Sequence, residues 1–202
     1  MRRLALPAAA VTLAAACASR QPAAEVVSTT TTTTTTTTMT PAPAPMASGG
    51  AMTSMRPTAS PRDTARGTVG GVNVLVDYGR PYKKGRAIFA ADGLVPFGRV
   101  WRTGANAATT LVTSGDLTVG GTRVPAGTYT LYTVPNAGAW QLVINRQTGQ
   151  WGTVYNQAQD LARVPMTVAT LSAPVEQFTV AVEGNALVMR WDTTEARATL
   201  SR

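Results

Sequence analysis

The chain has 202 residues and a formal net charge of +8, with no histidine and a single cysteine, Cys17. Without histidine, the sequence excludes a Ser-His-Asp triad, a Cys-His dyad and every histidine-ligated metal site. A single cysteine excludes an intrachain disulfide, so a hydrophobic core has to stabilise the fold. There is also no P-loop or dinucleotide fingerprint, and we expect neither a cofactor nor a metal ion.

Residues 1–17 are typical of an export signal. In MRRLALPAAAVTLAAACASR, two arginines precede an apolar run that is too short to span a bilayer, and small residues lead to Cys17. LAAAC resembles a bacterial lipobox, which implies that Cys17 is lipid-modified, becomes the new N-terminus and anchors the protein to a membrane. The leucine stands four residues before the cysteine, where three is usual. The alternative is an ordinary signal peptide, cut near residues 14–16, that releases a soluble exported protein.

The charge and the location narrow the range of partners. Removing Arg2 and Arg3 with the signal reduces the net charge from +8 to +6. A basic exported protein can meet anionic headgroups, acidic polysaccharide or phosphate. Nucleic acid is not expected, because the location is wrong and no helical basic patch is present. Ala18 and Ser19 lack the aspartate of the inner-membrane retention type, so the lipoprotein resemblance implies the outer membrane.

Residues 18–62 are predicted to form a disordered tether. They include ten consecutive threonines, Thr29 to Thr38, and three prolines that stiffen the segment at 41, 43 and 45. Such a composition offers too little apolar surface to offset the chain entropy lost on folding. The remaining residues, 63–202, have the usual size of one domain with its own core.

The domain is predicted to be all-β. The first strand, within 71–79, alternates apolar and polar residues with a period of two. Further strands are expected over 109–114, 116–119, 128–134, 140–145, 162–171, 177–183, 186–192 and 196–201. Hairpin turns are expected at Gly120-Gly121 and Gly184-Asn185, and a helical turn only at 156–161. This pattern favours an antiparallel β-sandwich or a jelly-roll-like domain.

Several motifs in a fixed order carry a family resemblance. They are VDYGRPYKKGRAIFA, GLVPFGRVWRTGANAATTL, VPAGTYTLYTVP, QWGTVY and APVEQFTV, between about Val69 and Leu200. Together they resemble a bacterial family of exported domains of unknown function, DUF2911. The resemblance implies a mostly β domain without an established activity. The family usually reads G-A-N-E-A-T, whereas Ala107 follows Asn106 here, so any role of that carboxylate is absent or moved in this chain.

A basic and aromatic segment offers the main candidate site. Cations and aromatic rings alternate along it, namely Arg80, Tyr82, Lys83, Lys84, Arg86, Phe89, Phe97, Arg99, Trp101 and Arg102. Arginine forks and aromatic faces commonly hold a phosphate, a carboxylate or a sugar ring. We predict a ligand site on one rim of the domain, with Trp101 as a platform. The polar contacts of this site are Arg80, Arg86, Arg102 and Asn106.

A structural corner explains the same segment equally well. Alternation places Val100 and Arg102 on one face, so one of the arginines can turn inward and either pair with Asp77 or cap loop carbonyls. The amide of Asn106 would then satisfy its own turn. The other tryptophans, Trp140, Trp151 and Trp191, are expected in the core, and the exception to consider is Trp151, because the small neighbours Gly149 and Gly152 would leave its ring accessible.

The functional prediction is a non-catalytic envelope protein that binds a small anionic or carbohydrate ligand, or a partner protein. One alternative is a carboxylate-dependent hydrolase of envelope glycans, which needs two carboxyl groups about 5 to 10 Å apart in one cleft. Its candidates are Asp77, Asp92, Asp116, Asp160, Glu176, Glu183 and Asp192, and the sequence gives no reason to pair any two of them. A purely structural envelope protein is the other alternative.

Overall fold

The structure, a computed structural model, describes residues 59–202. The predicted signal peptide, Cys17 and nearly all of the predicted tether lie outside the described residues. The strands are β1 (Arg62–Val69), β2 (Val72–Gly79), β3 (Phe89–Ala90), β4 (Val95–Pro96), β5 (Thr109–Thr113), β6 (Leu117–Val119), β7 (Thr122–Val124), β8 (Gly127–Val134), β9 (Trp140–Asn145), β10 (Asp160–Glu183) and β11 (Ala186–Ser201). Across residues 59–202 no helix is long and apolar enough to cross a membrane.

Nine strands form one antiparallel sheet in the order β1-β2-β5-β8-β9-β10-β11-β6-β7. The two-residue strands β3 and β4 form a separate parallel pair. The sheet does not close into a barrel, and the prediction of an all-β antiparallel domain is confirmed. The predicted turns at Gly120-Gly121 and Gly184-Asn185 also connect paired strands, β6 with β7 and β10 with β11. A 3-10 turn, Gln157–Gln159, lies within the predicted helical turn.

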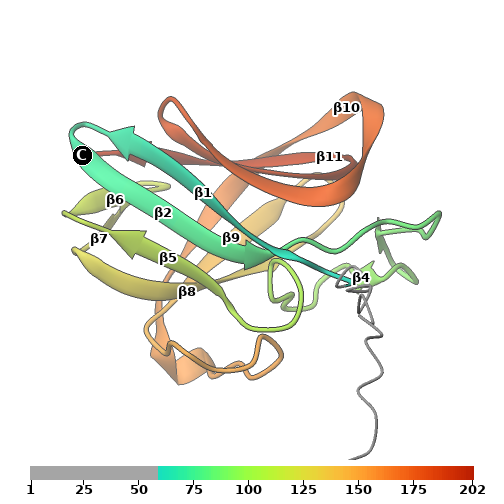
Figure 1. Ribbon diagram of the computed structural model, residues 1–202, viewed down its shortest axis with the longest axis horizontal. Coiled ribbons are helices and arrows are strands. Elements are labelled where there is room, and N and C mark those ends of the chain that lie inside the picture. The colour runs from blue at the N-terminus through green and yellow to red at the C-terminus, as the bar shows by residue number, and fades with distance from the viewer. Residues whose placement is uncertain (1–58) are drawn as a thin grey trace, which may run out of the picture. The chain divides into compact units, whose positions relative to one another are not determined.

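The longest strands, β10 and β11, differ from the sequence prediction, which divided them into four shorter strands. β10 pairs first with β9, through residues 160–166, and then with β11, through residues 167–183. Register shifts on either side of Val175 and a positive φ of 53° at Asp192 let the pair bend without ending. The β10–β11 hairpin thereby folds over the other strands (Figure 1). The breaks in alternation mark bulges within the two strands, because a bulge changes the register while pairing continues.

The core fills the space between these two parts of the sheet. Its buried side chains come from β2, β8, β9 and the β10–β11 hairpin, and include Val76, Tyr78, Leu131, Leu142, Ile144, Phe178, Leu187 and Met189. β1, which was not predicted as a strand, pairs with β2 and approaches β10 closely. A Cβ atom at Gly67 would come within 2.5 Å of Val182 Cγ1, so glycine is required for this approach.

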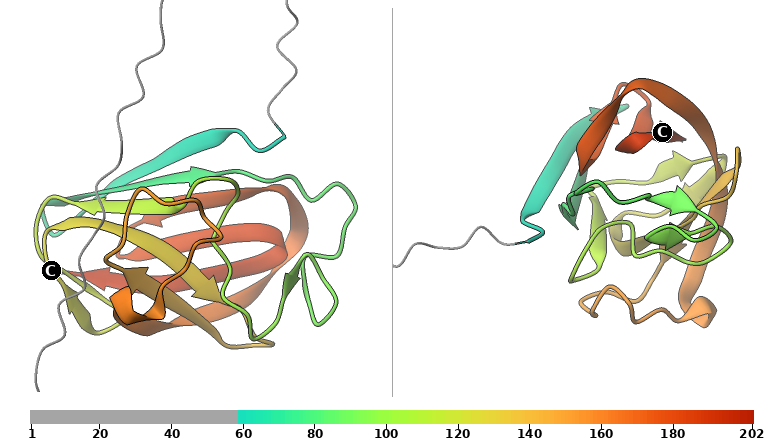
Figure 2. Two further views of the ribbon diagram at one scale, coloured as in Figure 1. Left: turned by 90° about the horizontal axis from the view of Figure 1, so that it is seen from below. Right: turned by 90° about the vertical axis from the view of Figure 1, so that its right-hand side faces the viewer.

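An aromatic cluster occupies the side of the core below the β2–β5 connection. The rings of Trp101 and Trp191 are stacked, with centroids 5.8 Å apart, and Phe178 and Phe89 meet Trp101 edge-on. Trp140 and Trp191 are buried as predicted, whereas Trp151 is 55% exposed and is the exception to the expected core position. The loops around residues 80–106 extend from the sheet on this side of the domain (Figure 2). The aromatic residues of these loops therefore form the inner wall of the space between the loops.

Candidate functional site

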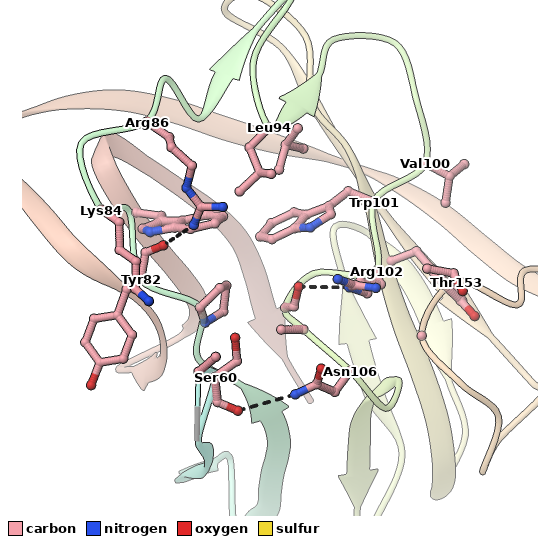
Figure 3. A pocket seen from close by; sticks show the side chains of 18 of the residues that line it. Ser60, Tyr82, Lys84, Arg86, Leu94, Val100, Trp101, Arg102, Asn106 and Thr153 are labelled. Carbon is pink, nitrogen blue, oxygen red and sulfur yellow. Dashed lines mark hydrogen bonds between the residues drawn. The ribbon is translucent and has the colours of Figure 1, made fainter. Parts of the chain in front are cut away.

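A cleft of about 690 Å³ opens between these loops (Figure 3). Five parts of the chain supply its walls, namely the residues before β1, the β2–β5 connection, β8, the loop of residues 150–155 and β11: Ala59, Ser60, Pro81, Tyr82, Lys84, Arg86, Leu94, Val95, Val100, Trp101, Arg102, Gly104, Ala105, Asn106, Tyr132, Gly152, Thr153, Tyr155 and Trp191. The structure brings four of the five predicted site residues together in this lining: Arg86, Trp101, Arg102 and Asn106. Arg80 does not line the cleft. A volume of this size lies in the range of small-molecule sites.

The chain reaches the cleft through a constrained corner at residues 101–106. Backbone hydrogen bonds in both directions fix Trp101 to Thr133 of β8, at 2.7 and 2.9 Å. Thr103 is fully buried in the left-handed region, at φ 53°, which is unfavourable for a β-branched residue. Its side chain contacts the Thr133 hydroxyl at 3.2 Å, and its carbonyl accepts a 2.7 Å hydrogen bond from the hydroxyl of Thr109. These contacts hold the strained backbone in place.

Two glycines on neighbouring segments allow the corner to pack backbone against backbone. A Cβ atom at Gly79, the last residue of β2, would come within 2.2 Å of the Ala105 carbonyl oxygen. On the other side, the Gly152 amide donates to the Asn106 carbonyl at 2.9 Å, and the Ala108 amide donates to the Gln150 carbonyl at 3.2 Å. The corner is therefore clamped between the end of β2 and the QWG segment, and both neighbours require glycine.

Arg102 and Asn106 leave this corner toward the cleft. The half-buried Arg102 side chain donates from Nε to the Gly104 carbonyl at 3.3 Å, and its terminal nitrogens bond to no other residue of 59–202. The Asn106 amide donates to the Ser60 carbonyl at 3.5 Å, and Asn106 has a φ of 64°. The expected inward pairing with Asp77 is made instead by Arg62. The segment is thus a structural corner that also presents a guanidinium to the cleft.

Arg86 and Lys84 supply positive charge from another wall of the cleft. Arg86 donates from Nε to the Lys83 carbonyl at 2.9 Å and from Nη2 to the Tyr82 carbonyl at 2.6 Å, which orients the guanidinium at the mouth. Figure 3 shows the Arg86 and Arg102 side chains on different sides of the cleft. The Lys84 amide donates to the Glu176 carboxylate at 2.8 Å, which fixes the backbone below its exposed side chain. Lys84 was part of the predicted basic segment but was not selected as a site residue.

Arg80 has a structural position. Its guanidinium pairs with Asp63 at 3.0 Å, and it donates to the Phe178 carbonyl and the Thr179 hydroxyl, both at 3.2 Å. These partners belong to β1 and β10, so Arg80 links the two strands beside the core. All of the guanidinium nitrogens have protein acceptors, which leaves Arg80 little capacity for a ligand.

The lining of the cleft has a strong charge asymmetry. It contains three cations and, among residues 59–202, no aspartate or glutamate. Two carboxylates contact lining residues from outside the cleft: Glu176, at the Lys84 amide, and Asp160, which accepts a 2.6 Å hydrogen bond from the Tyr155 hydroxyl and pairs with Arg163 at 3.0 Å. Burial and the Asp160 carboxylate raise the pKa of Tyr155, so its hydroxyl stays neutral at physiological pH. A positive, partly enclosed surface of this kind attracts anions.

Two lining residues outside the basic segment, Tyr132 and Tyr155, were not predicted. Their rings meet edge-on at 4.9 Å, and the Tyr132 hydroxyl donates to the Val154 carbonyl at 2.6 Å. This bond and the Gly152 amide hold the loop of residues 150–155 against the cleft. The QWGTVY motif could have indicated that this loop takes part in the cleft, because a small residue beside aromatic residues marks a close approach of two segments.

None of the candidate carboxylates for catalysis lines the cleft. Glu183 lies with Glu195, which was not among the candidates, and Arg190 and Arg197 bridge both of them. The Arg190 hydrogen bond lowers the pKa of Glu183, and the Arg197 hydrogen bond lowers that of Glu195, so neither carboxyl suits a general acid. Neither residue lines the cleft. In the described part of the chain, no group of three acidic or cysteine side chains could hold a metal ion.

Comparisons with known proteins identify the family without a function. No curated protein and no solved structure matches the chain significantly. The family model described as protein of unknown function DUF2911 matches residues 60–200, which covers the described domain almost completely and more than half of the chain. It includes β1 and every residue of the cleft lining except Ala59. The chain therefore belongs to the DUF2911 family of proteins of unknown function.

Proposed function

We propose that this protein is a non-catalytic binding domain of the cell envelope and that its cleft holds a small anionic ligand. One observation carries the proposal: Lys84, Arg86 and Arg102 line a single cleft whose described lining contains no carboxylate. Unpaired cations in a partly enclosed site repel one another, and an anion relieves that repulsion. The Arg102 terminal nitrogens and the remaining Arg86 nitrogen supply the donors for a carboxylate or phosphate group.

The apolar inner wall favours a ligand that is more than a bare ion. Trp101 and Trp191 both line the cleft, and both belong to the aromatic cluster of the core. Their packing fixes the wall before a ligand arrives, which reduces the entropic cost of binding. A neutral sugar could also lie on Trp101, but three cations without an acidic acceptor suit an anion better than a neutral hydroxylated ring.

The composition of the lining supports binding over hydrolysis. A carboxylate-dependent hydrolase needs two carboxyl groups in one cleft. The acidic pair Glu183 and Glu195 is shared between two arginines outside the cleft. Asp160 is engaged by both Tyr155 and Arg163. We therefore propose no catalytic residue.

The location belongs to the same proposal and depends on the sequence alone. The basic head, apolar run and LAAAC motif of residues 1–17 support export and lipidation of Cys17, with the outer membrane as destination. The membrane, through this anchor, would be the protein's standing partner. The low-complexity segment that follows would separate the domain from that membrane.

Titration calorimetry of the purified protein with phenyl phosphate and benzoate tests the proposal, with phenol as the uncharged probe. We expect the anions to bind, phenol to bind at least tenfold more weakly, and affinity to fall as NaCl is raised. Arg102→Gln and Arg86→Gln should each weaken anion binding about tenfold, the value of one charge-assisted contact. Arg99→Gln is the matched control, because Arg99 is an exposed arginine that does not line the cleft.

Two results would overturn the proposal. The first is equal binding of phenol and the anions, which would mean that the cations play no part. The second is an absence of binding by either anion to a protein that melts cooperatively. Unchanged affinity in both cleft arginine variants would place the anion site elsewhere in the molecule.

A further inference from the structure

Two of the exposed large hydrophobic residues among residues 59–202 line the cleft, and two more are adjacent in sequence to lining residues. Among residues 59–202, five large hydrophobic residues are clearly exposed: Leu94 at 47%, Val100 at 38%, Val112 at 37%, Trp151 at 55% and Val154 at 49%. Leu94 and Val100 line the cleft directly. Trp151 and Val154 flank two lining residues, Gly152 and Thr153. Only Val112, on β5, lies away from the cleft.

This distribution requires an explanation, because a single exposed hydrophobic residue is ordinary but a group around one opening is not. Leu94 keeps 47% of its surface exposed although it lines the cleft. The loop of residues 150–155 is also fixed by hydrogen bonds from Gly152 and Tyr132, so its apolar residues are held at the surface. Within the cleft lining, the exposed apolar surface consists of Leu94 and Val100, which we call the rim.

The rim and the cations lie on the same loops. The three cations Lys84, Arg86 and Arg102 come from the β2–β5 connection, as do Leu94 and Val100, and all five line the cleft (Figure 3). An inorganic anion would use the cations and leave the rim in water. A ligand with an acidic group and an apolar body would use both, and it would bury the exposed surface of Leu94 and Val100.

We propose that the ligand is an amphipathic anion: one acidic head group held by Lys84, Arg86 and Arg102, joined to an alkyl chain that covers Leu94 and Val100. This inference rests on the proposed function and specifies the ligand class of the same cleft. The head group is a carboxylate or a phosphate, and the molecule enters as a monomer. A cleft of about 690 Å³ accommodates a head group and a short chain, but not a patch of bilayer.

The test is a chain-length series measured by calorimetry on the purified protein. Alkyl phosphates and alkyl carboxylates of four, six and eight carbons are titrated below the concentrations at which they form micelles. Because each buried methylene adds a nearly constant free energy, affinity should rise about threefold or more per added carbon. Octyl glucoside, which has the same chain without the charge, should bind at least tenfold more weakly than octyl phosphate. Vesicles of anionic phospholipid form a further arm.

Variants assign the chain-length effect to the rim. Leu94→Ser and Val100→Ser should flatten the rise in affinity with chain length, so that octyl phosphate loses more affinity than butyl phosphate. Val112→Ser is the matched control, because Val112 and Val100 are almost equally exposed and Val112 lies outside the cleft. Since all three side chains are exposed, the substitutions should preserve the fold.

The outcomes separate this inference from the proposed function. Equal affinity for four-carbon and eight-carbon anions overturns the amphiphile and leaves the anion cleft standing. Absence of binding by every anion overturns both. Binding to vesicles without binding to any monomeric amphiphile also overturns the inference, because it would identify a membrane-docking surface instead. Loss of the chain-length effect in Val112→Ser alone would place the apolar contact on β5.

Discussion

The side chain of Arg102 lies directly against Gly152. A Cβ atom at Gly152 would come within 2.8 Å of Arg102 Cδ and 2.7 Å of the Asn106 carbonyl oxygen. The Gly152 amide also donates to that carbonyl at 2.9 Å. The absence of a side chain at residue 152 therefore sets the direction in which Arg102 extends, and it couples the QWGTVY loop to the cation of the cleft.

Gly152→Ala should displace Arg102 and weaken binding of phenyl phosphate about tenfold, the value of one charge-assisted contact. It should also lower the free energy of unfolding by about 1 to 3 kcal/mol, because a backbone oxygen has to move. Calorimetry and chemical denaturation measure the two effects. Gly115→Ala is the control, since its Cβ would meet only the Val72 side chain, at 3.1 Å, outside the cleft. Full anion affinity in Gly152→Ala would contradict the coupling.

Arg80→Gln should reduce stability and leave ligand binding intact. The substitution removes the ion pair with Asp63 and weakens the hydrogen bonds to Phe178 and Thr179, so we expect a loss of about 1 to 3 kcal/mol. Urea denaturation measures this loss, and titration with phenyl phosphate measures binding. If Arg80→Gln has normal stability but binds the anion more weakly, Arg80 contacts the ligand after all.

The stability of the domain should fall in acid through Glu183 and Glu195. Hydrogen bonds from Arg190 and Arg197 lower the pKa of both carboxyls below the value of about 4.3 that glutamate has in an unfolded chain. A lowered pKa contributes stability that is complete above the unfolded value and is lost as the pH falls through the folded value. The melting temperature should therefore be level above about pH 5 and decrease below about pH 4.

Glu195→Gln isolates this contribution. At pH 7 the variant should be less stable by about 1 to 3 kcal/mol, because a buried acceptor of two arginines is weakened. The difference from the unmodified protein should shrink as the pH falls below 4. Asp116→Asn is the comparison, since the Asp116–Arg123 pair is exposed and should contribute little. A difference that stays constant from pH 7 to pH 3 would contradict the assignment.

Cys17→Ser should abolish lipid modification. In bacteria expressing the full chain, we expect the protein with Cys17 to partition with membranes and to gain the mass of a lipid group at this cysteine. The Cys17→Ser variant should remain unlipidated. Mass spectrometry and membrane fractionation give independent measurements. If the protein with Cys17 is instead cleaved between residues 14 and 16 and released in soluble form, the segment is an ordinary signal peptide.

Much of the fold follows from local sequence pattern. Alternation within β2 and β8 and the Gly120-Gly121 turn predicted paired strands correctly, because side chains in a strand point alternately to the two faces. β1 gave no such signal, since Ala65 and Gly67 face the core where larger residues would mark a strand. β10 was divided because Pro174 and the register shifts near it interrupt alternation, whereas the tertiary structure keeps it paired with β9 and β11.

The sequence by itself determined the residue types of the candidate site and the chemistries that are excluded. The absence of histidine and the presence of a single cysteine are properties of composition, and the cluster of cations and aromatic rings is local to one segment. Only the tertiary structure showed that Arg102 lines the cleft and that Arg80 does not. The two residues are alike in a one-dimensional pattern, but Asp63, Phe178 and Thr179 surround Arg80, while Gly152 leaves room for Arg102. Residues distant in sequence supply those acceptors and that space, so local periodicity could not reveal them.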